Sequence, residues 1–298
     1  TYFFKWSSGG HDVRPDDPDL GLGIGGRDAE RERCRWWHPL LGIRIGEARH
    51  PGPRERKRGQ QHMSLVTLNS NVWSTARSWM QLQTNVTQVV MLQEHRMLAA
   101  ACDAAQTAVR RDGWRIGFAE ATPAETSTSA GVAVAVPTHI GIENVMHEEW
   151  NGSPQQMPGR IARAWVNVMG GLAVFSIYMR CSEGWSAENV QLAQQLASLI
   201  KETEGLWVVG GDWNMLPNEL QSHPVFEEIG GVLTAPSRGT CYTNGGWKKY
   251  DYFIVHPAMR FHIAKVEVDG GDTRPHLPVR LKLLTTVPGL VQRAPKQP

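Results

Sequence analysis

Residues 206–214 read LWVVGGDWN, an apolar run that ends directly in an acid, Asp212, and an amide, Asn214. Three further apolar runs end in polar side chains in the same way: LVTL leads into Asn69 and Asn71, VVML into Gln93 and Glu94, and FSI into Tyr178. One such ending is ordinary, because strands leave the core at their ends. Four together favour a shared polar site, since buried carboxylates are unfavourable unless they are paired or bind a cation.

The same pattern of short apolar runs, separated by amphipathic stretches and turn residues, extends outward from this segment and is typical of a layered α/β domain. It predicts strands at 65–70, 88–92, 114–119, 131–136, 161–168, 172–178, 206–210, 250–255, 262–268 and 278–284. It predicts helices at 74–84, 97–111 and 186–202. So many strands with few helices between them exceed one small sheet, so we expect two sheets packed face to face with helices outside.

The two ends of the chain lack this pattern. Residues 1–62 are rich in Gly, Pro, Asp and Arg, with GLGIGG at 21–26. No Lys-Ser or Lys-Thr follows that glycine run and no strand precedes it, so a flexible segment is favoured over a phosphate-binding loop. We therefore expect one folded domain at 63–285 and a tail at 286–298.

The charge distribution gives no independent argument that the predicted domain binds a polyanion. The chain has 298 residues, 41% of them hydrophobic, and a formal net charge of +2. Lys and Arg number 12 against 9 Asp and Glu in residues 1–60, but 19 against 20 in the remaining 238. The case for a nucleic-acid partner must therefore come from a local site or from the basic segment at 49–58.

The cysteines and the hydropathy pattern bear on the compartment. Cys34, Cys102, Cys181 and Cys241 lie far apart, without the paired spacing of structural zinc or redox motifs, which favours a reducing compartment. No apolar stretch is long enough for a membrane span, and no signal-peptide pattern begins the chain. We expect a soluble intracellular protein that is not associated with a membrane.

The residue types at the strand ends indicate which chemistry the site performs. Glu94 and Asp212 offer hard oxygen ligands, which suit Mg²⁺ or Mn²⁺ together with waters and a substrate phosphate. Asn69 can hold a carboxylate, a water or a phosphate oxygen without adding charge. His276 beside a carboxylate such as Asp251 could serve as an acid, a base or a phosphate contact, because the carboxylate fixes its orientation.

A series of motifs along the chain resembles the endonuclease/exonuclease/phosphatase superfamily. In order they are LNSN (68–71), LQEH (92–95), AGVAV (130–134), SIYM (176–179), GDWN (211–214), YDYFIVH (250–256) and HLPV (276–279). Within the superfamily they look most like the endonuclease domains of non-LTR retrotransposons and the apurinic endonucleases. The resemblance implies a four-layer αββα sandwich, one or two Mg²⁺ ions, and in-line attack of water on a phosphodiester.

The resemblance also implies a role for each matching residue. The metal side would comprise Glu94 as principal ligand, with Asn69, Asn71 and Asp212 beside it. Asp212 would also orient or activate the attacking water, and the remaining catalytic roles would fall to Asn214 at the phosphate, Tyr178 in the transition state and the pair Asp251 and His276. Independently of the resemblance, a phosphate substrate needs cationic partners, for which the candidates are Arg160, Arg163, Arg180 and Lys248.

Two positions depart from the superfamily pattern. Pro275 stands where an Asp usually precedes the histidine, so weaker metal affinity is expected unless Asp272 folds back to replace it. Arg180 stands where a proline commonly follows the tyrosine. An arginine there could clamp a phosphate or lie exposed on the loop.

The favoured function is a Mg²⁺-dependent DNA endonuclease that nicks in the manner of a retroelement enzyme or cleaves abasic sites. A phosphatase or an RNA 3′-end nuclease of the same fold is the enzymatic alternative, because a fold does not fix function. A catalytically degenerate nucleic-acid-binding module is the alternative from another class. DNA is the expected partner, with a fused or downstream reverse transcriptase and a nuclear location as further expectations.

Overall fold

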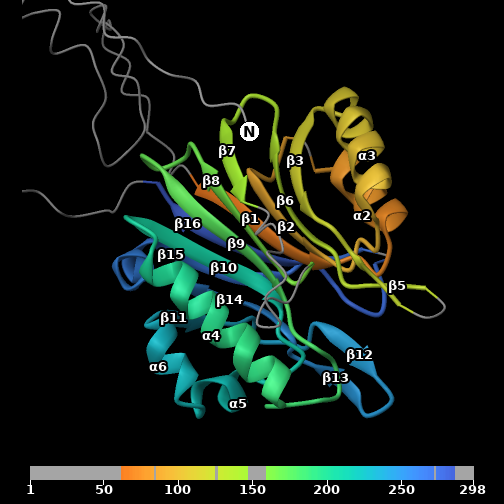
Figure 1. The fold of residues 1–298 in the computed structure, drawn as a ribbon. Coiled ribbons are helices and arrows are strands. Elements are labelled where there is room, and N and C mark those ends of the chain that lie inside the picture. The colour runs from red at the N-terminus through yellow and green to blue at the C-terminus, as the bar shows by residue number, and fades with distance from the viewer. Residues whose placement is uncertain (1–61, 84, 125–126, 147–158, 272, 286–298) are drawn as a thin grey trace, which may run out of the picture.

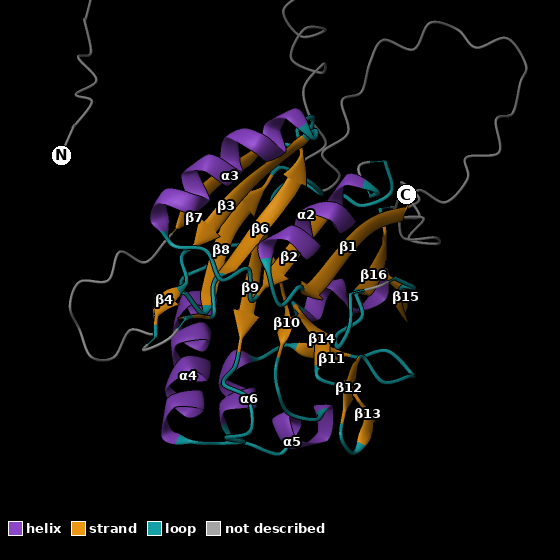
Figure 2. Cartoon of the chain, turned by 90° about the vertical axis from the view of Figure 1, so that its right-hand side faces the viewer, coloured by secondary structure: helices purple, strands orange, loops and turns teal. Residues whose placement is uncertain are grey.

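In the computed structural model, residues 62–285 are described except for 84, 125–126, 147–158 and 272, and they form two packed β-sheets with helices on both outer faces (Figures 1 and 2). The predicted flexible segment, residues 1–62, lies outside the described residues apart from His62, and so does the predicted tail at 286–298. Within the described part of the chain, no helix combines the length and the apolar character needed to cross a bilayer.

The first sheet has six strands, and its two central ones run parallel. In spatial order the strands are β15 (Ile263–Val268), β16 (Val279–Leu284), β1 (His62–Asn69), β2 (Val89–Gln93), β6 (Val132–Pro137) and β3 (Trp114–Ala119). β1 and β2 are the parallel pair, and all other neighbours are antiparallel. The parallel pair matters for the site because β1 and β2 end at the same edge of the sheet.

The second sheet repeats this arrangement. In spatial order its strands are β11 (Val232–Thr234), β14 (Asp251–Val255), β10 (Leu206–Asp212), β9 (Leu172–Tyr178), β8 (Ile161–Val166) and β7 (Ile142–Met146). β9 and β10 are parallel, and β14 pairs with β10 in the antiparallel sense. Two small hairpins lie outside both sheets: β4 (Thr122–Pro123) with β5 (Thr128–Ser129), and β12 (Cys241–Thr243) with β13 (Gly246–Lys248).

Helices cover the outer face of each sheet, which gives four layers (Figure 2). The helices are α2 (Trp73–Gln81) and α3 (Ala99–Arg111) on the first sheet, and α4 (Ala187–Lys201), α5 (Pro217–Gln221) and α6 (Val225–Ile229) on the second. A 3-10 helix, η1 (Pro257–His262), follows β14. Three separate clusters of buried apolar side chains fill the three interfaces between layers. The predicted αββα sandwich is confirmed.

The two-residue alternation of strands decides which polar side chains face the gap between the sheets. In β1, the face that carries Leu65 in the inter-sheet core continues two residues at a time to Asn69. In β10, the face of Val208 continues in the same way to Asp212. Tyr178 ends β9 as part of the same inter-sheet cluster. The apolar pattern that builds the core therefore also aims these polar ends at one another.

Gly210 allows the two sheets to approach closely just before this polar edge. A Cβ atom at Gly210 would lie 2.7 Å from the sulfur of Met91 in the opposite sheet and 2.9 Å from the ring of Phe253. Real Cβ contacts are longer than this, so a larger residue would force the Met91 side chain and the Phe253 ring to shift. Packing between the sheets thus explains the first glycine of LWVVGGDWN, Gly210.

The predicted strands and helices are all present, with ends that shift by at most three residues. The structure adds elements that no periodic pattern indicated: β4, β5, β7, β11, β12, β13, α5, α6 and η1. These elements span two to six residues each, which is too short for a helix or strand period to become visible.

Candidate active site

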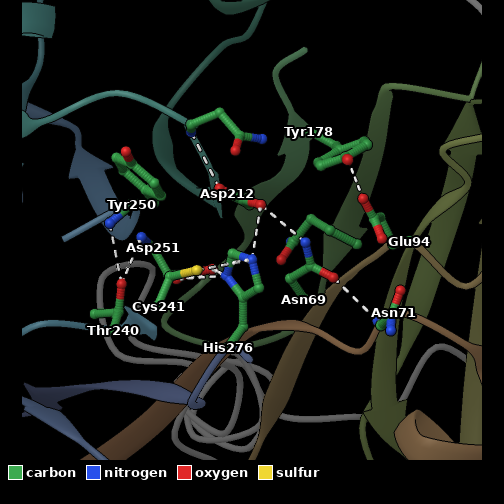
Figure 3. Close-up of polar contacts among 12 residues, drawn as sticks. Asn69, Asn71, Glu94, Tyr178, Asp212, Thr240, Cys241, Tyr250, Asp251 and His276 are labelled. Carbon is green, nitrogen blue, oxygen red and sulfur yellow. Dashed lines mark hydrogen bonds and ion pairs between the residues drawn. The ribbon is translucent and has the colours of Figure 1, made fainter. Parts of the chain in front are cut away.

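Polar side chains from both sheets meet at one edge of the sandwich (Figure 3). Asn69, Tyr178 and Asp212 are the last residues of β1, β9 and β10. Asp251 is the first residue of β14, and the antiparallel pairing places it opposite Asp212. Glu94 directly follows β2. The strand directions therefore bring these predicted site residues together.

Two side-chain hydrogen bonds join the sheets across the site. The side-chain amide of Asn69 donates to Oδ2 of Asp212 at 2.8 Å. The hydroxyl of Tyr178 donates to Oε1 of Glu94 (Figure 3). Asn69 and Asp212 are almost fully buried, so these contacts hold the carboxylates in fixed positions instead of leaving them to solvent.

A second set of hydrogen bonds lies closer to the apolar core than Asn69 and Tyr178 do, and it forms the floor of the site. The side-chain amide of Gln93 donates to Oγ of Ser176 at 2.8 Å, and Ser176 in turn donates to the backbone oxygen of Leu92. Oγ1 of Thr67 donates to the Gln93 side-chain oxygen at 3.2 Å. All of these side chains are buried, and their hydrogen bonds satisfy one another, so the floor separates the site from the apolar core.

His276 and Asp251 form the predicted dyad. Nδ1 of His276 lies 2.9 Å from Oδ2 of Asp251, and since an ionised carboxylate only accepts, Nδ1 carries the proton and donates. Asp251 is fully buried, and its backbone N–H donates to Oγ1 of Thr240. Nε2 of His276 faces Asp212, with 3.6 Å between Nε2 and Oδ2. One imidazole thus lies between two buried carboxylates.

This arrangement shifts the protonation of both partners. Burial raises the pKa of Asp212 to about 7, and the charge of Asp251 adds to this while His276 opposes it. Burial disfavours the imidazolium of His276, but the charges of Asp251 and Asp212 outweigh that effect and raise its pKa well above the usual value. The cluster therefore holds a proton at neutral pH, and Asp212 can exchange one near that pH.

Arg160, which precedes β8, packs against Tyr178. Its guanidinium carbon lies 5.0 Å from the centre of the Tyr178 ring, and Nη1 donates to the Tyr178 backbone oxygen at 3.2 Å. Burial, reinforced by the charge of Glu94, raises the pKa of Tyr178, so its hydroxyl keeps its proton and remains a donor. A buried cation therefore lies directly behind the tyrosine.

A tight turn after β2 presents Glu94. Glu94 and Arg96 both adopt the left-handed backbone region, with φ of 55° and 56°. His95 between them is buried, its Nε2 lies 3.1 Å from the Ala119 oxygen, and burial lowers its pKa to about 4. A Cβ at Gly131 would lie 2.6 Å from the His95 ring, which explains the glycine of the AGVAV motif. His95 is thus a neutral structural anchor for Glu94.

The oxygen donors around Glu94 fit a hard divalent cation such as Mg²⁺ or Mn²⁺. The Glu94 side chain is 14% exposed, and its two oxygens accept one hydrogen bond each, from Tyr178 and Arg96, which leaves further lone pairs. The amide oxygen of Asn69 accepts from the backbone N–H of the exposed Asn71 at 3.0 Å. One carboxylate with amide and water oxygens is a common set of Mg²⁺ ligands.

The other predicted substrate contacts are placed differently. The side-chain amide of Asn214 donates to the Met179 backbone oxygen at 2.8 Å, and its backbone N–H donates to Oδ1 of Asp212, so Asn214 belongs to the site. Arg180 directly follows Met179, with Nη1 3.8 Å from the Glu183 carboxylate. Lys248 lies on β13, half-buried.

Arg163 is not part of the site. It lies in the middle of β8, opposite Phe175, and lines a pocket with Trp165 and Glu202 near the C-terminal end of α4. The reason is the strand alternation: Ala162 and Ala164 face the inter-sheet core, so Arg163 faces the helix layer. The prediction that Arg163 contacts substrate is therefore corrected, and of the two arginines predicted in this segment only Arg160 lies beside the site.

Comparison with known proteins identifies the fold. No family model and no curated protein matches the sequence. A 3′ phosphatase from Neisseria bound to a product DNA hairpin is 20% identical with a TM-score of 0.53, over 74% of this chain and 99% of that one. An AP endonuclease from Archaeoglobus fulgidus is 17% identical with a TM-score of 0.55, over 75% and 100%. A mannosyl-6-phosphatase from Bacteroides thetaiotaomicron is 14% identical with a TM-score of 0.52, over 74% and 99%. The fold of this chain is that of the endonuclease/exonuclease/phosphatase proteins.

Proposed function

We propose that this chain is a divalent-cation-dependent hydrolase that cleaves phosphodiesters in nucleic acid, most readily DNA. One observation carries the proposal: the buried Asp212 carboxylate contacts both Asn69 and the His276–Asp251 dyad, at the same strand edge as Glu94 and Tyr178. A structural role alone does not require two buried acids around one histidine, because burying such groups is unfavourable.

The side chains divide the chemistry among them. A divalent cation held by Glu94, with Asn69, Asn71 and Asp212 as further ligands, would supply charge that polarises a phosphoryl oxygen. Asp212, held by Asn69 and facing His276, accepts the proton of the attacking water. Asp251 holds His276 through Nδ1, so that the N–H at Nε2 is directed at the site. There Nε2 can donate to the developing negative charge on the phosphate.

Two further donors support the same reaction. Tyr178 keeps its hydroxyl proton and can donate to a phosphate oxygen when Glu94 engages the cation. Asn214, fixed by Met179 and by Asp212, presents the remainder of its amide to the substrate. These donors are preorganised by contacts within the protein, which is the main requirement for stabilising charge in a transition state.

The β12–β13 hairpin favours nucleic acid over a small phosphorylated molecule. Tyr242 and Trp247 are exposed by 57% and 46%, and their rings meet edge to face at 5.4 Å. Lys248 follows Trp247 on the same hairpin, and Cys241 at its start lies against His276. Exposed aromatic rings beside a cation are the means by which proteins stack bases and attract phosphates, so the hairpin suits a base-bearing polymer.

Pro275 is expected to lower the affinity of the site for its cation. Its backbone oxygen accepts from the N–H of Tyr242 at 3.0 Å, so the segment before His276 is attached to the hairpin. Pro275 provides no carboxylate, and Asp272, the candidate replacement, lies outside the described residues. We expect activity that requires more Mg²⁺ than an enzyme with an additional acidic ligand, and better support by Mn²⁺.

The test is nicking of supercoiled plasmid DNA with Mg²⁺ or Mn²⁺. Glu94→Gln and His276→Gln are expected to lower the rate by about 10²–10⁴-fold. Glu188→Gln and His139→Gln, which alter exposed residues of the same types, are the matched controls and should nick normally. If wild type nicks no DNA and no abasic duplex, but releases phosphate from RNA 3′ ends or sugar phosphates, the alternative substrate classes replace DNA. If it turns over none of these, the chain is a binding module.

The position at which DNA is cleaved distinguishes the two predicted kinds of endonuclease. Nicking at a preferred sequence in intact duplex would favour the retroelement type, and cleavage confined to abasic sites would favour repair. The fused or downstream reverse transcriptase and the nuclear location remain predictions tied to the first of these outcomes.

A further inference from the structure

Thr240, which directly precedes β12, is a fully buried residue beside the His276–Asp251 dyad, and the proposed hydrolysis makes no direct use of it. Its Oγ1 accepts hydrogen bonds from the backbone N–H groups of Tyr250 and Asp251, each at 3.0 Å (Figure 3). The same hydroxyl donates to the backbone oxygen of Lys248 at 3.3 Å. A hydroxyl has one donor and two acceptor lone pairs, so this hydroxyl uses all of its capacity within the protein.

The backbone of Thr240 holds the segment that carries His276. Its carbonyl oxygen accepts from the N–H of Leu277, the residue after His276, at 2.8 Å. The next residue, Cys241, forms an isolated antiparallel bridge with His276 itself. Asp251 and His276 are 25 positions apart in the sequence, and Thr240 lies against both of their chain segments, one through its hydroxyl and the other through its backbone.

Thr240 is also attached to the β12–β13 hairpin. Its backbone N–H donates at 2.7 Å to the Lys248 oxygen that its hydroxyl also contacts. Gly239 allows this close approach, because a Cβ there would lie 2.6 Å from Cβ of Trp247 and 3.2 Å from the backbone nitrogen of Lys248. The hairpin that carries the exposed Trp247 is therefore connected to the dyad through Thr240.

The backbone N–H of Asp251 depends on the Thr240 hydroxyl as its acceptor. Both residues are fully buried, so water does not replace a lost acceptor without a change of structure, and an unpaired buried N–H is unfavourable. Without the hydroxyl, the backbone at 250–251 would move toward another acceptor. The imidazole of His276 would follow, because its Nδ1 donates to Asp251 at 2.9 Å. A displacement of about 1 Å at a reacting group can lower a rate by about 10²-fold.

We propose that Thr240 is a positioning residue: its hydroxyl fixes the backbone of Asp251, and through Asp251 it sets the direction in which Nε2 of His276 faces the substrate. Because Thr240 also holds Lys248, a nucleic acid bound along the hairpin is aligned with the dyad. The effect on turnover rests on the proposed hydrolase function. The effect on the hydrogen bond between His276 and Asp251 does not depend on any activity, so the two are tested separately.

The kinetic test compares Thr240→Val, which keeps the shape of the side chain but removes the hydroxyl, with Thr240→Ser, which restores the hydroxyl. On a small chromogenic phosphodiester with Mn²⁺, Thr240→Val should lower kcat by about 10²-fold with KM nearly unchanged, and Thr240→Ser should recover most of kcat. Thr87→Val is the matched control, because Thr87 is also fully buried and its hydroxyl accepts from Arg280 at 2.8 Å, before the start of β2. It should lose stability to urea but keep the wild-type kcat. Equal losses of kcat in the two valine variants, or a wild-type kcat in Thr240→Val, overturn the proposal.

A second measurement reports on the dyad without substrate or metal. In EDTA, the Nδ1–H proton of His276 should give a downfield NMR signal, because it is buried and donated to Asp251; its absence from His276→Gln assigns it. The signal should be preserved in Thr240→Ser and Thr87→Val, and shifted or lost in Thr240→Val. An unchanged signal in Thr240→Val overturns the proposal. If the chain cleaves no phosphodiester, the hydrolase proposal fails, while this signal still decides whether Thr240 positions the dyad.

Thr240→Ala replaces Thr240→Val if the valine variant does not fold. Alanine leaves a polar space in which a water can accept from the N–H groups of Tyr250 and Asp251, so this variant should be the more stable of the two. A water held there is not fixed by the chain, so Thr240→Ala should still lose kcat, though less than Thr240→Val, and should shift the His276 signal. A wild-type kcat together with an unshifted signal in Thr240→Ala overturns the proposal.

Discussion

Asn69 and Asp212 lie in different sheets, yet the amide of one donates a 2.8 Å hydrogen bond to the carboxylate of the other. The contact fixes the rotamer of Asp212 and opposes the rise in its pKa that burial causes. Because the carboxylate is buried to all but 1%, water cannot replace the lost donor without opening the edge of the sandwich.

The first prediction concerns this pair. Asn69→Ala should lower the free energy of unfolding by about 1–3 kcal/mol, since it leaves a buried carboxylate short of a donor. It should also raise the pKa of Asp212, so the acidic limb of the pH–rate profile moves to higher pH. Urea unfolding and a rate profile check both effects, with the exposed Asn218→Ala as control. A profile that does not move would mean that Asp212 is not the titrating base.

The second prediction concerns the hydroxyl of Tyr178. Tyr178→Phe keeps the ring over Arg160 but removes the donor to Glu94, so turnover should fall by about 10²-fold. Stability should change by no more than about 1.5 kcal/mol. Tyr252→Phe is the matched control, because that hydroxyl donates to the Met215 oxygen beneath α5 and away from the reacting groups. Equal activity losses in the two variants would indicate a purely structural role for Tyr178.

The third prediction concerns pH and the neutral His95. Its pKa is about 4 in the folded protein and about 6.5 when unfolded, so the unfolded chain binds more protons between these values. The stability from His95 is complete above pH 6.5 and is lost as pH falls toward 4, by at most about 3 kcal/mol. Urea midpoints in EDTA from pH 7 to pH 4 should fall less steeply in His95→Gln than in wild type. His139→Gln, at an exposed position, should match the wild-type slope.

The fourth prediction concerns the exposed aromatic pair. Trp247→Ala should weaken binding of single-stranded or abasic DNA by about 5–100-fold, the range for loss of one base stack. Hydrolysis of a small chromogenic phosphodiester should be unaffected, because the exposed ring of Trp247 packs on Tyr242 of the hairpin. Phe261→Ala, which removes a 75% exposed ring on η1, is the control. Unchanged DNA affinity would leave the hairpin without a role in substrate binding.

The fold was predictable because alternation and apolar runs dominate the long strands. The run from Leu206 ends at the predicted acid, and the structure extends the strand through Asp212. The identities of the polar strand ends also indicated which residues would meet, since parallel neighbours such as β1 and β2 end together. Local pattern was sufficient wherever the site lies at the end of a strand.

The rest of the site depends on contacts between distant segments. Arg160 and Arg163 are three residues apart, and only the strand alternation in the folded sheet shows that the first lies behind Tyr178 and the second beneath the helices. Cys241 and His276 are separated by 35 positions and have no motif spacing between them. An isolated antiparallel backbone bridge joins them in the folded protein.

The contacts between Tyr178 and Glu94 and between Asn69 and Asp212 both cross from one sheet to the other. Neither sheet alone therefore contains a competent set of groups, and a small relative displacement of the two halves would separate the partners while each half kept its own hydrogen-bond ladder. Heat, denaturant or a proteolytic cut should consequently abolish catalysis before far-ultraviolet circular dichroism registers any loss of strand or helix.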